Sequence, residues 1–170
     1  MILRLWGGML CLSVCLLWPI APYAQEDPIQ QRQAYIQAGG AVLTAYEKEQ
    51  RGWNHYFTTV APRQNASEQT KSQETYRRFL EDALTKWRQI TVIPVCHSSH
   101  VLYELALYSY SIAADFHLTE LYTTSALFVQ KALDLAAERA RYYTTQGDEY
   151  FKRAALLAQV DECVYLPPAK

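Results

Sequence analysis

The chain has 170 residues, with 16 Lys or Arg against 17 Asp or Glu, so its formal net charge at pH 7 is -1. This near balance argues against a nucleic-acid-binding protein, because a protein that follows a phosphate backbone needs a concentrated basic face. The length suits one domain with a sizeable core.

The N-terminal residues 1–24 have the order of regions that is typical of a secretory signal peptide. An apolar run over residues 5–20 follows one positive charge, and Ala24 precedes a polar stretch. Cleavage would leave residues 25–170 as a single helical domain in the periplasm or outside the cell. An uncleaved anchor and a lipid anchor at Cys15 remain open, and we expect membrane association only in those two cases.

Export also decides how the cysteines are interpreted. Cys11 and Cys15 fall within the signal, which leaves Cys96 and Cys163 as the pair that would meet an oxidising compartment. We therefore predict a disulfide between Cys96 and Cys163. In the chain-entropy model a loop of this length contributes roughly 4 kcal/mol of stability.

The mature sequence has a helical pattern with no competing strand signal. A first helix is predicted over residues 28–51, because Asp27 can cap it and a proline occupies its first position. Gly39 and Gly40 predict a bend or break within it. Residues 52–67 contain Gly, Pro and Asn without a sustained period, and we expect a long loop there.

The rest of the chain predicts further helices with short connections. Residues 68–93 have the clearest heptad-like period, and the nearly uncharged residues 98–115 predict a central helix that its neighbours must cover. A long helix follows over residues 119–145, where Gly147 is expected to stop it and Asp148 to cap a final short helix.

This order of elements predicts an all-α fold, an antiparallel bundle of four to five helices. A diverged tetratricopeptide-like array of helical pairs is the alternative fold. Its required self-similarity is not found in the sequence.

One constellation of polar residues lies on the central helix. His97, His100 and Glu104 are spaced i, i+3 and i+7, which places them on one side of a helix. Two imidazoles and a carboxylate are competent ligands for a divalent transition metal, and Cys96 is adjacent as a possible thiolate. The alternative is a polar stripe without a metal. No catalytic residue and no cofactor is assigned, because nucleophile-elbow and phosphate-loop motifs are absent from the sequence.

Aromatic residues supply the second set of candidates, a partner or ligand surface. The six residues are Trp53, Tyr56, Phe57, Tyr108, Tyr110 and Tyr122. Tyr joins an apolar body to a polar tip and so suits binding surfaces, although such residues also cover cores.

The sequence thus favours an exported, non-enzymatic helical domain that works by protein–protein interaction. An adaptor, an assembly factor or a subunit in the cell envelope would fit, with a protein partner or a second copy of the chain. The alternative function is metal or small-ligand binding in the bundle through the stripe of His97, His100 and Glu104.

Overall fold

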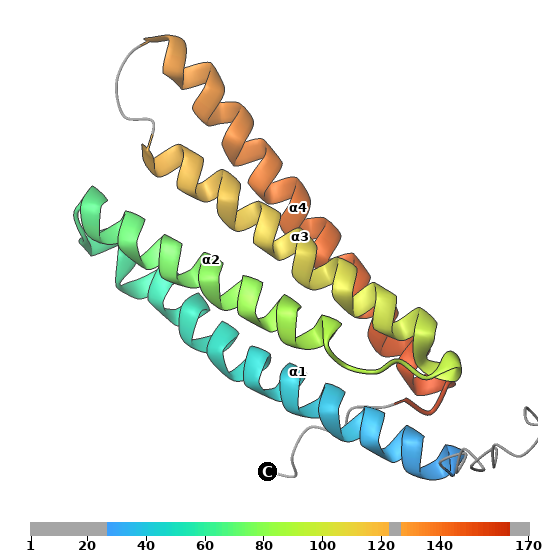
Figure 1. Ribbon diagram of the computed structural model, residues 1–170. Helices are drawn as coiled ribbons and strands as arrows, with labels where there is room; N and C mark the ends of the chain where they lie inside the picture. The colour runs from blue at the N-terminus through green and yellow to red at the C-terminus, as the bar shows by residue number, and fades with distance from the viewer. Residues whose placement is uncertain (1–26, 123–126, 164–170) are drawn as a thin grey trace, which may run out of the picture.

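The computed structural model describes residues 27–122 and 127–163, which form an all-α bundle of four helices without a strand (Figure 1). The elements are α1 (Pro28–Thr59), η1 (Ala61–Arg63), α2 (Ala66–Arg88), η2 (Pro94–Cys96), α3 (His97–Tyr122) and α4 (Leu127–Val160). The helices run alternately up and down, so the start of α3 and the end of α4 lie at the opposite end from the α1–α2 turn (Figure 1). The predicted fold class is confirmed.

α1 begins as the sequence predicts. The Asp27 carboxylate accepts a hydrogen bond from the Ile29 N–H at 3.0 Å, and Pro28 occupies the first turn. Of the bend or break predicted at Gly39 and Gly40, the break is wrong, since α1 is continuous through both glycines. Two glycines cost about 1 kcal/mol each in a helix interior, and the long buried face of α1 outweighs this cost.

The loop predicted over residues 52–67 is also wrong for its first half, because α1 continues to Thr59. Trp53 and Phe57 pack against Tyr76 of α2, with ring centroids 5.4 and 5.2 Å apart. Aromatic side chains four residues apart share one helix face, so this packing favours helix there. Only residues 60–65, which include η1, separate α1 from α2.

The ends of α2 and α3 differ from the predicted ends in opposite directions. α2 ends at Arg88, five residues earlier than predicted, and Ile93 is extended before Pro94, because a residue that precedes proline disfavours the helical region. α3 continues past residue 115, where the predicted central helix ends, as far as Tyr122. Leu118 is buried there and extends the apolar face of the helix.

α4 is one helix, so the stop predicted at Gly147 and the cap predicted at Asp148 are wrong. A Cβ placed on Gly147 would lie 2.6 to 2.9 Å from ring atoms of Tyr110 on α3. Glycine therefore serves close contact between two helices at this position. The Asp148 carboxylate accepts a hydrogen bond from the Tyr110 hydroxyl at 2.7 Å.

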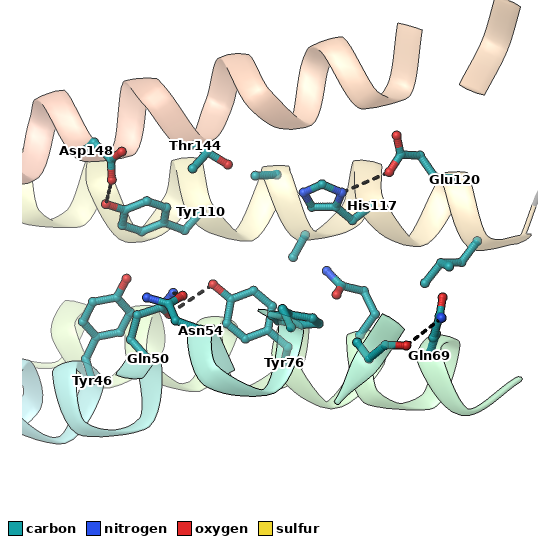
Figure 2. Close-up of a pocket in the computed structure, with 16 residues that line it drawn as sticks. Tyr46, Gln50, Asn54, Gln69, Tyr76, Tyr110, His117, Glu120, Thr144 and Asp148 are labelled. Atoms are coloured by element: carbon teal, nitrogen blue, oxygen red, sulfur yellow. Dashed lines mark hydrogen bonds and ion pairs between the residues drawn. The ribbon is translucent and has the colours of Figure 1, made fainter. Parts of the chain in front are cut away.

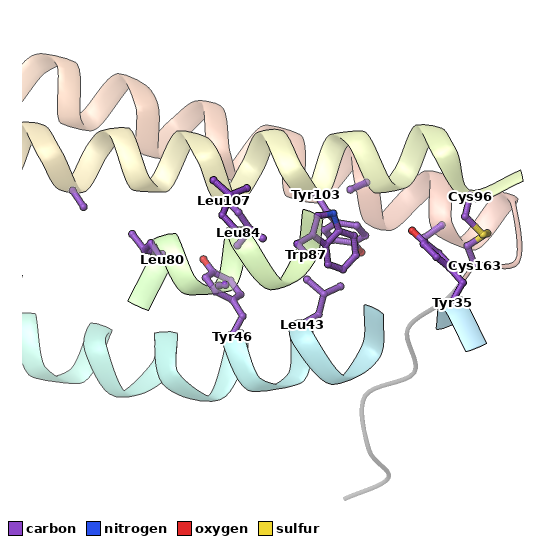
Figure 3. Packing of buried hydrophobic residues seen from close by; sticks show 14 residues of the cluster. Tyr35, Leu43, Tyr46, Leu80, Leu84, Trp87, Cys96, Tyr103, Leu107 and Cys163 are labelled. Atoms are coloured by element: carbon purple, nitrogen blue, oxygen red, sulfur yellow. A yellow bond between two sulfur atoms is a disulfide. The ribbon is translucent and has the colours of Figure 1, made fainter. Parts of the chain in front are cut away.

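The apolar core is centred on α3, as its near lack of charge predicts. Leu107 of α3 and Trp87 and Leu80 of α2 are fully buried (Figure 3). The buried small residues of the described part of α4 include Ala136, Ala140, Ala154 and Ala158, together with Gly147. Small side chains let the backbones of α3 and α4 approach closely.

The predicted disulfide between Cys96 and Cys163 is confirmed, with a Cα–Cα distance of 5.9 Å (Figure 3). It joins the start of α3 to the end of α4, and both cysteines are fully buried. Arg32 of α1 reaches the same end, where it donates to the Asp161 carbonyl and pairs with Glu162 at 3.2 Å. This end of the bundle is thereby tied together.

The disulfide is consistent with an oxidising compartment outside the cytoplasm. Over residues 27–122 and 127–163, no helix combines the length and the apolarity that crossing a bilayer requires. The predicted signal at residues 1–24 lies outside the described residues.

Candidate functional site

The side chains on the inward faces of the helices change from apolar to polar along the bundle. Towards the α1–α2 turn, the face of α1 that carries the buried Tyr46 continues into the half-buried Gln50 and the exposed Asn54, and the corresponding face of α2 carries the buried Gln73 and the half-buried Gln69. Residues three or four apart share a helix face, so these amides occupy the positions that apolar side chains fill nearer the disulfide. The apolar core thus gives way to a polar interior.

A cleft of about 620 Å³ opens at this place, between the α1–α2 hairpin and the α3–α4 hairpin (Figure 2). Its volume lies within the range of about 300–1,000 Å³ that is usual for small-molecule sites. Aromatic side chains from three helices form much of its wall. They are Tyr46, Phe57, Tyr76 and Tyr110.

Two carboxylates lie at opposite ends of the cleft (Figure 2). At one end, Asp148 of α4 accepts the hydrogen bond from Tyr110. At the other end, Glu120 of α3 lies 3.0 Å from the Nδ1 of His117. The described residues that line the cleft include no Lys and no Arg, so the cleft favours positive charge.

Hydrogen bonds fix the amides on the floor of the cleft. The Tyr76 hydroxyl donates to Gln50 Oε1 at 3.1 Å, and Gln50 Nε2 donates to Asn54 Oδ1, also at 3.1 Å. Gln69 Nε2 donates to the carbonyl of Ala61 in η1 at 2.8 Å. The floor is therefore organised without a ligand.

Gln73 and Tyr46 differ from these residues, because their side-chain polar groups have no hydrogen-bond partner among the described residues. Each residue is only 5% exposed, and each lines the cleft. Among the described residues, no buried side-chain N or O atom lacks a hydrogen-bond partner, so the Gln73 amide and the Tyr46 hydroxyl are open to solvent in the cleft. The Tyr46 hydroxyl points towards Tyr110 and Asp148 (Figure 2). These two groups are available to a ligand.

The tyrosines of the cleft remain protonated. Burial raises the pKa of Tyr46 strongly, and burial together with the hydrogen bond to Asp148 raises the pKa of Tyr110. Burial also raises the pKa of Tyr76, against a smaller opposing effect of its hydrogen bond with Gln50. All three hydroxyls are neutral at physiological pH and serve as hydrogen-bonding groups.

The stripe of His97, His100 and Glu104 is not assembled into one site. Glu104 accepts a hydrogen bond from Arg88 Nε at 2.7 Å, His97 is exposed, and the buried His100 ring stacks on Trp87 with centroids 4.8 Å apart. The adjacent cysteine is in the disulfide. Within the described part of the chain, no three or more His, Cys, Asp or Glu side chains are grouped as metal ligands.

The three aromatic residues expected in a loop lie instead on the last turns of α1. Phe57 lines the cleft. Trp53 and Tyr56 pack against Phe57 with centroids 5.7 and 5.3 Å away, and so support it.

The three predicted tyrosines of α3 have separate environments. Tyr110 lines the cleft. Tyr108 and Tyr122 are exposed on the outside of the bundle, where the Tyr122 hydroxyl donates to Glu74 of α2. Of the six predicted surface residues, the structure thus brings Phe57 and Tyr110 together in one cleft.

Sequence reasoning missed most residues of the cleft, among them Tyr46, Gln73, His117, Glu120 and Asp148. The signal that could have found them is polarity in the register of a core stripe. Gln73 precedes Tyr76 and Leu80 at helical spacing, so an inward position was readable from the sequence. Asp148 was interpreted as a helix cap, and for that reason it was not considered as a site residue.

The fold and the cleft define a four-helix bundle with a polar, aromatic-walled interior site. Comparisons with protein-family models, curated proteins and solved structures give no match. The function is therefore argued from the geometry of the cleft.

Proposed function

We propose that the chain is an exported, non-enzymatic binding protein whose ligand site is the cleft between the two hairpins. The observation that carries this proposal is a cleft of about 620 Å³ onto which the polar groups of Gln73 and Tyr46 open without a hydrogen-bond partner among the described residues. A bound ligand could take the place of solvent at both groups and form hydrogen bonds with them.

The groups in the cleft suit binding better than turnover. The tyrosines are held in the neutral form, as described above. The Thr144 hydroxyl donates to the Ala140 carbonyl at 2.9 Å, and His117 is paired with Glu120. An activated nucleophile needs an adjacent base, and Thr144 is engaged with a backbone oxygen instead.

Export is the second part of the proposal. The signal-like residues 1–24 and the disulfide between Cys96 and Cys163 both support a periplasmic or secreted location. The mature protein would then meet its ligand outside the cytoplasm.

A ligand screen by NMR tests the proposed site. The ¹⁵N-labelled mature chain is titrated with a panel of neutral sugars, amino acids, organic anions and organic amines. We expect at least one member to shift amide signals around the cleft. Thr144→Trp, which places a large ring at the cleft wall, should abolish these shifts while the helical circular dichroism stays unchanged.

The matched control is Ala38→Trp, at an exposed position of α1 that lines a different groove. This variant should bind as the parent chain does. Shifts that survive Thr144→Trp, or a panel that leaves the cleft signals unmoved, would contradict the proposal.

A protein partner or a second copy of the chain is the second candidate, and exposed apolar residues on α4 favour it. Leu135, Tyr142, Leu156 and Val160 are each more than half exposed. Their spacing puts them on one face of the helix. Such an adaptor or subunit should give a crosslinked complex in the cell envelope or a dimer by sedimentation, and Leu156→Glu should remove it. A monomer without crosslinks would exclude this candidate.

A further inference from the structure

We propose that the cleft binds a linear organic diamine or polyamine, with one ammonium group at Asp148, another at Glu120, and the chain between them against the tyrosine walls. This inference rests on the proposed function and names its ligand class. Its recognition elements are two carboxylates, stacked tyrosines and the unpartnered amide of Gln73.

The charged side chains of the cleft favour a cationic ligand. The cleft is lined by two carboxylates and, among its described residues, by no Lys and no Arg; the imidazole of His117 is hydrogen-bonded to Glu120. An organic anion would be repelled by Asp148 and Glu120. A protonated amine forms charge-assisted hydrogen bonds with the same carboxylates, which are shorter and stronger than neutral ones.

The Asp148 end has the geometry of an ammonium site. The rings of Tyr46 and Tyr110 are stacked with centroids 6.3 Å apart, and an ammonium group over such faces is attracted by the ring quadrupoles. An ammonium group has three donors and no acceptor, so it needs oxygen acceptors around it. Asp148 provides carboxylate oxygens, and the unpartnered Tyr46 hydroxyl provides a lone pair.

The length of the cleft favours a linear ligand with charge at both ends. Tyr110, which binds Asp148, and Glu120 are ten residues apart on α3, which corresponds to about 15 Å along the helix axis. Gln73 lies between Gln69 and Tyr76 on the opposite wall. Its amide oxygen is therefore placed to accept from a secondary ammonium in the middle of the ligand.

Spermidine is the probe for calorimetric titration of the mature chain with its disulfide intact. We expect one site per chain, with an affinity that falls as the salt concentration rises, because exposed charges are screened. 1,3-Diaminopropane carries the same terminal groups on a chain too short to reach both carboxylates, and should bind at least about tenfold more weakly. Glucose and citrate serve as the neutral and the anionic probes.

Variants assign the binding to the cleft. Asp148→Asn and Glu120→Gln should each weaken spermidine binding by about tenfold, since each removes a charge-assisted hydrogen bond. The matched control is Glu149→Gln, which removes the same charge at the next position of α4. Glu149 pairs with Arg153 and does not line the cleft, so this variant should bind as the parent does.

Three results would overturn the inference. They are an absence of spermidine binding, an equal loss in Glu149→Gln and Asp148→Asn, and equal affinity for 1,3-diaminopropane. Glucose or citrate binding that Thr144→Trp abolishes, without spermidine binding, would overturn the amine class and leave the proposed ligand site standing. If no member of the NMR panel binds, the result would contradict the proposed ligand site itself.

Discussion

Gln73 tests whether a polar side chain that lines the cleft serves ligand binding rather than stability. Its amide has no hydrogen-bond partner among the described residues and opens onto the cleft. Gln73→Leu therefore removes no hydrogen bond within the described part of the protein. We expect it to leave the free energy of unfolding in urea denaturation within about 0.5 kcal/mol of the parent's, and to weaken spermidine binding.

Gln50→Leu is the comparison for that change. Gln50 bonds both Tyr76 and Asn54, so its replacement should lower the free energy of unfolding by about 1 kcal/mol. If Gln73→Leu were destabilising to the same extent, Gln73 would be a structural residue rather than a ligand-facing one.

Gly147 tests how closely α3 and α4 approach. A methyl group at this position would meet the Tyr110 ring at distances below 3.0 Å, so Tyr110 would have to leave Asp148 or the helices would have to separate. We expect Gly147→Ala to lower the free energy of unfolding by about 1–3 kcal/mol, measured by urea denaturation.

Gly40→Ala and Gly52→Ala are the controls. A Cβ at either position meets no atom within 4 Å, and alanine favours helix over glycine. Each control should therefore stabilise the protein by about 0.5–1 kcal/mol. A stabilising Gly147→Ala would show that the Tyr110 ring moves without cost.

The buried His100 should make the stability of the protein depend on pH. Its ring stacks on Trp87, its backbone carbonyl accepts from Trp87 Nε1 at 3.0 Å, and its Nδ1 lies 3.2 Å from the Tyr35 hydroxyl. Burial lowers the pKa of His100; the charge of Glu104 partly opposes this effect and His97 adds to it. The folded protein therefore prefers the neutral imidazole.

This direction fixes the sign of the pH dependence. The unfolded chain, with an ordinary His pKa of about 6.5, binds the proton more readily than the folded one. The contribution of His100 is thus present above about pH 6.5 and is lost as the pH falls towards the lowered pKa. We expect His100→Phe to flatten the decline in stability between pH 7 and pH 5, measured by urea denaturation. His97→Gln, at an exposed neighbour, should keep the parent slope; equal slopes in His100→Phe and the parent would contradict the assignment.

At the scale of elements, α2 depends on a reciprocal cap. Asn65 Oδ1 accepts from the Glu68 N–H at 3.0 Å, and Glu68 Oε2 accepts from the Asn65 N–H at 3.3 Å. Asn65→Ala should lower the free energy of unfolding by about 1 kcal/mol in urea denaturation, because it leaves an N-terminal N–H of the helix unpaired. Asn65→Asp keeps the acceptor and should retain most of the stability. Equal losses in both variants would show that the cap bond contributes little.

Helix existence was predictable from local chemistry, whereas helix length was not. Asp27 and Pro28 indicated the start of α1, and the heptad-like period of residues 68–93 indicated α2. Residues 52–59 resemble a loop in composition, and only their packing on another helix makes them helical. The same holds for Gly147, where the ring of a residue 37 positions away in the sequence explains the glycine.

At the scale of the whole molecule, the candidate site was less predictable than the fold. The bundle follows from periodicity and caps, which are properties of single segments. The cleft needs Tyr46, Gln73, Glu120 and Asp148, from four helices, to face one space. Spacing on α3 alone predicted the stripe of His97, His100 and Glu104, which the described residues do not group with a further metal ligand. Spacing on one helix does not say which partners the other helices supply.

The disulfide lies at one end of the bundle, and the cleft lies towards the other end. The disulfide and Arg32 tie the end where α3 begins and α4 ends, while the cleft lies towards the α1–α2 turn. The disulfide should therefore control global stability without shaping the ligand site directly.

The double variant Cys96→Ala with Cys163→Ala tests this separation. The bridge spans 67 residues, and its removal increases the entropy of the unfolded chain by an amount worth roughly 4 kcal/mol. We expect the double variant to lose stability of that order in urea denaturation and to become insensitive to reductant, whereas the parent chain should lose similar stability on reduction. Under conditions where the double variant remains folded, its spermidine affinity should lie within about threefold of the parent's, because the cysteines do not line the cleft. A small loss of stability would mean that packing around α3, without the disulfide, is enough to stabilise this end of the bundle. A large loss of affinity in the folded variant would mean that the two ends are coupled through the helices.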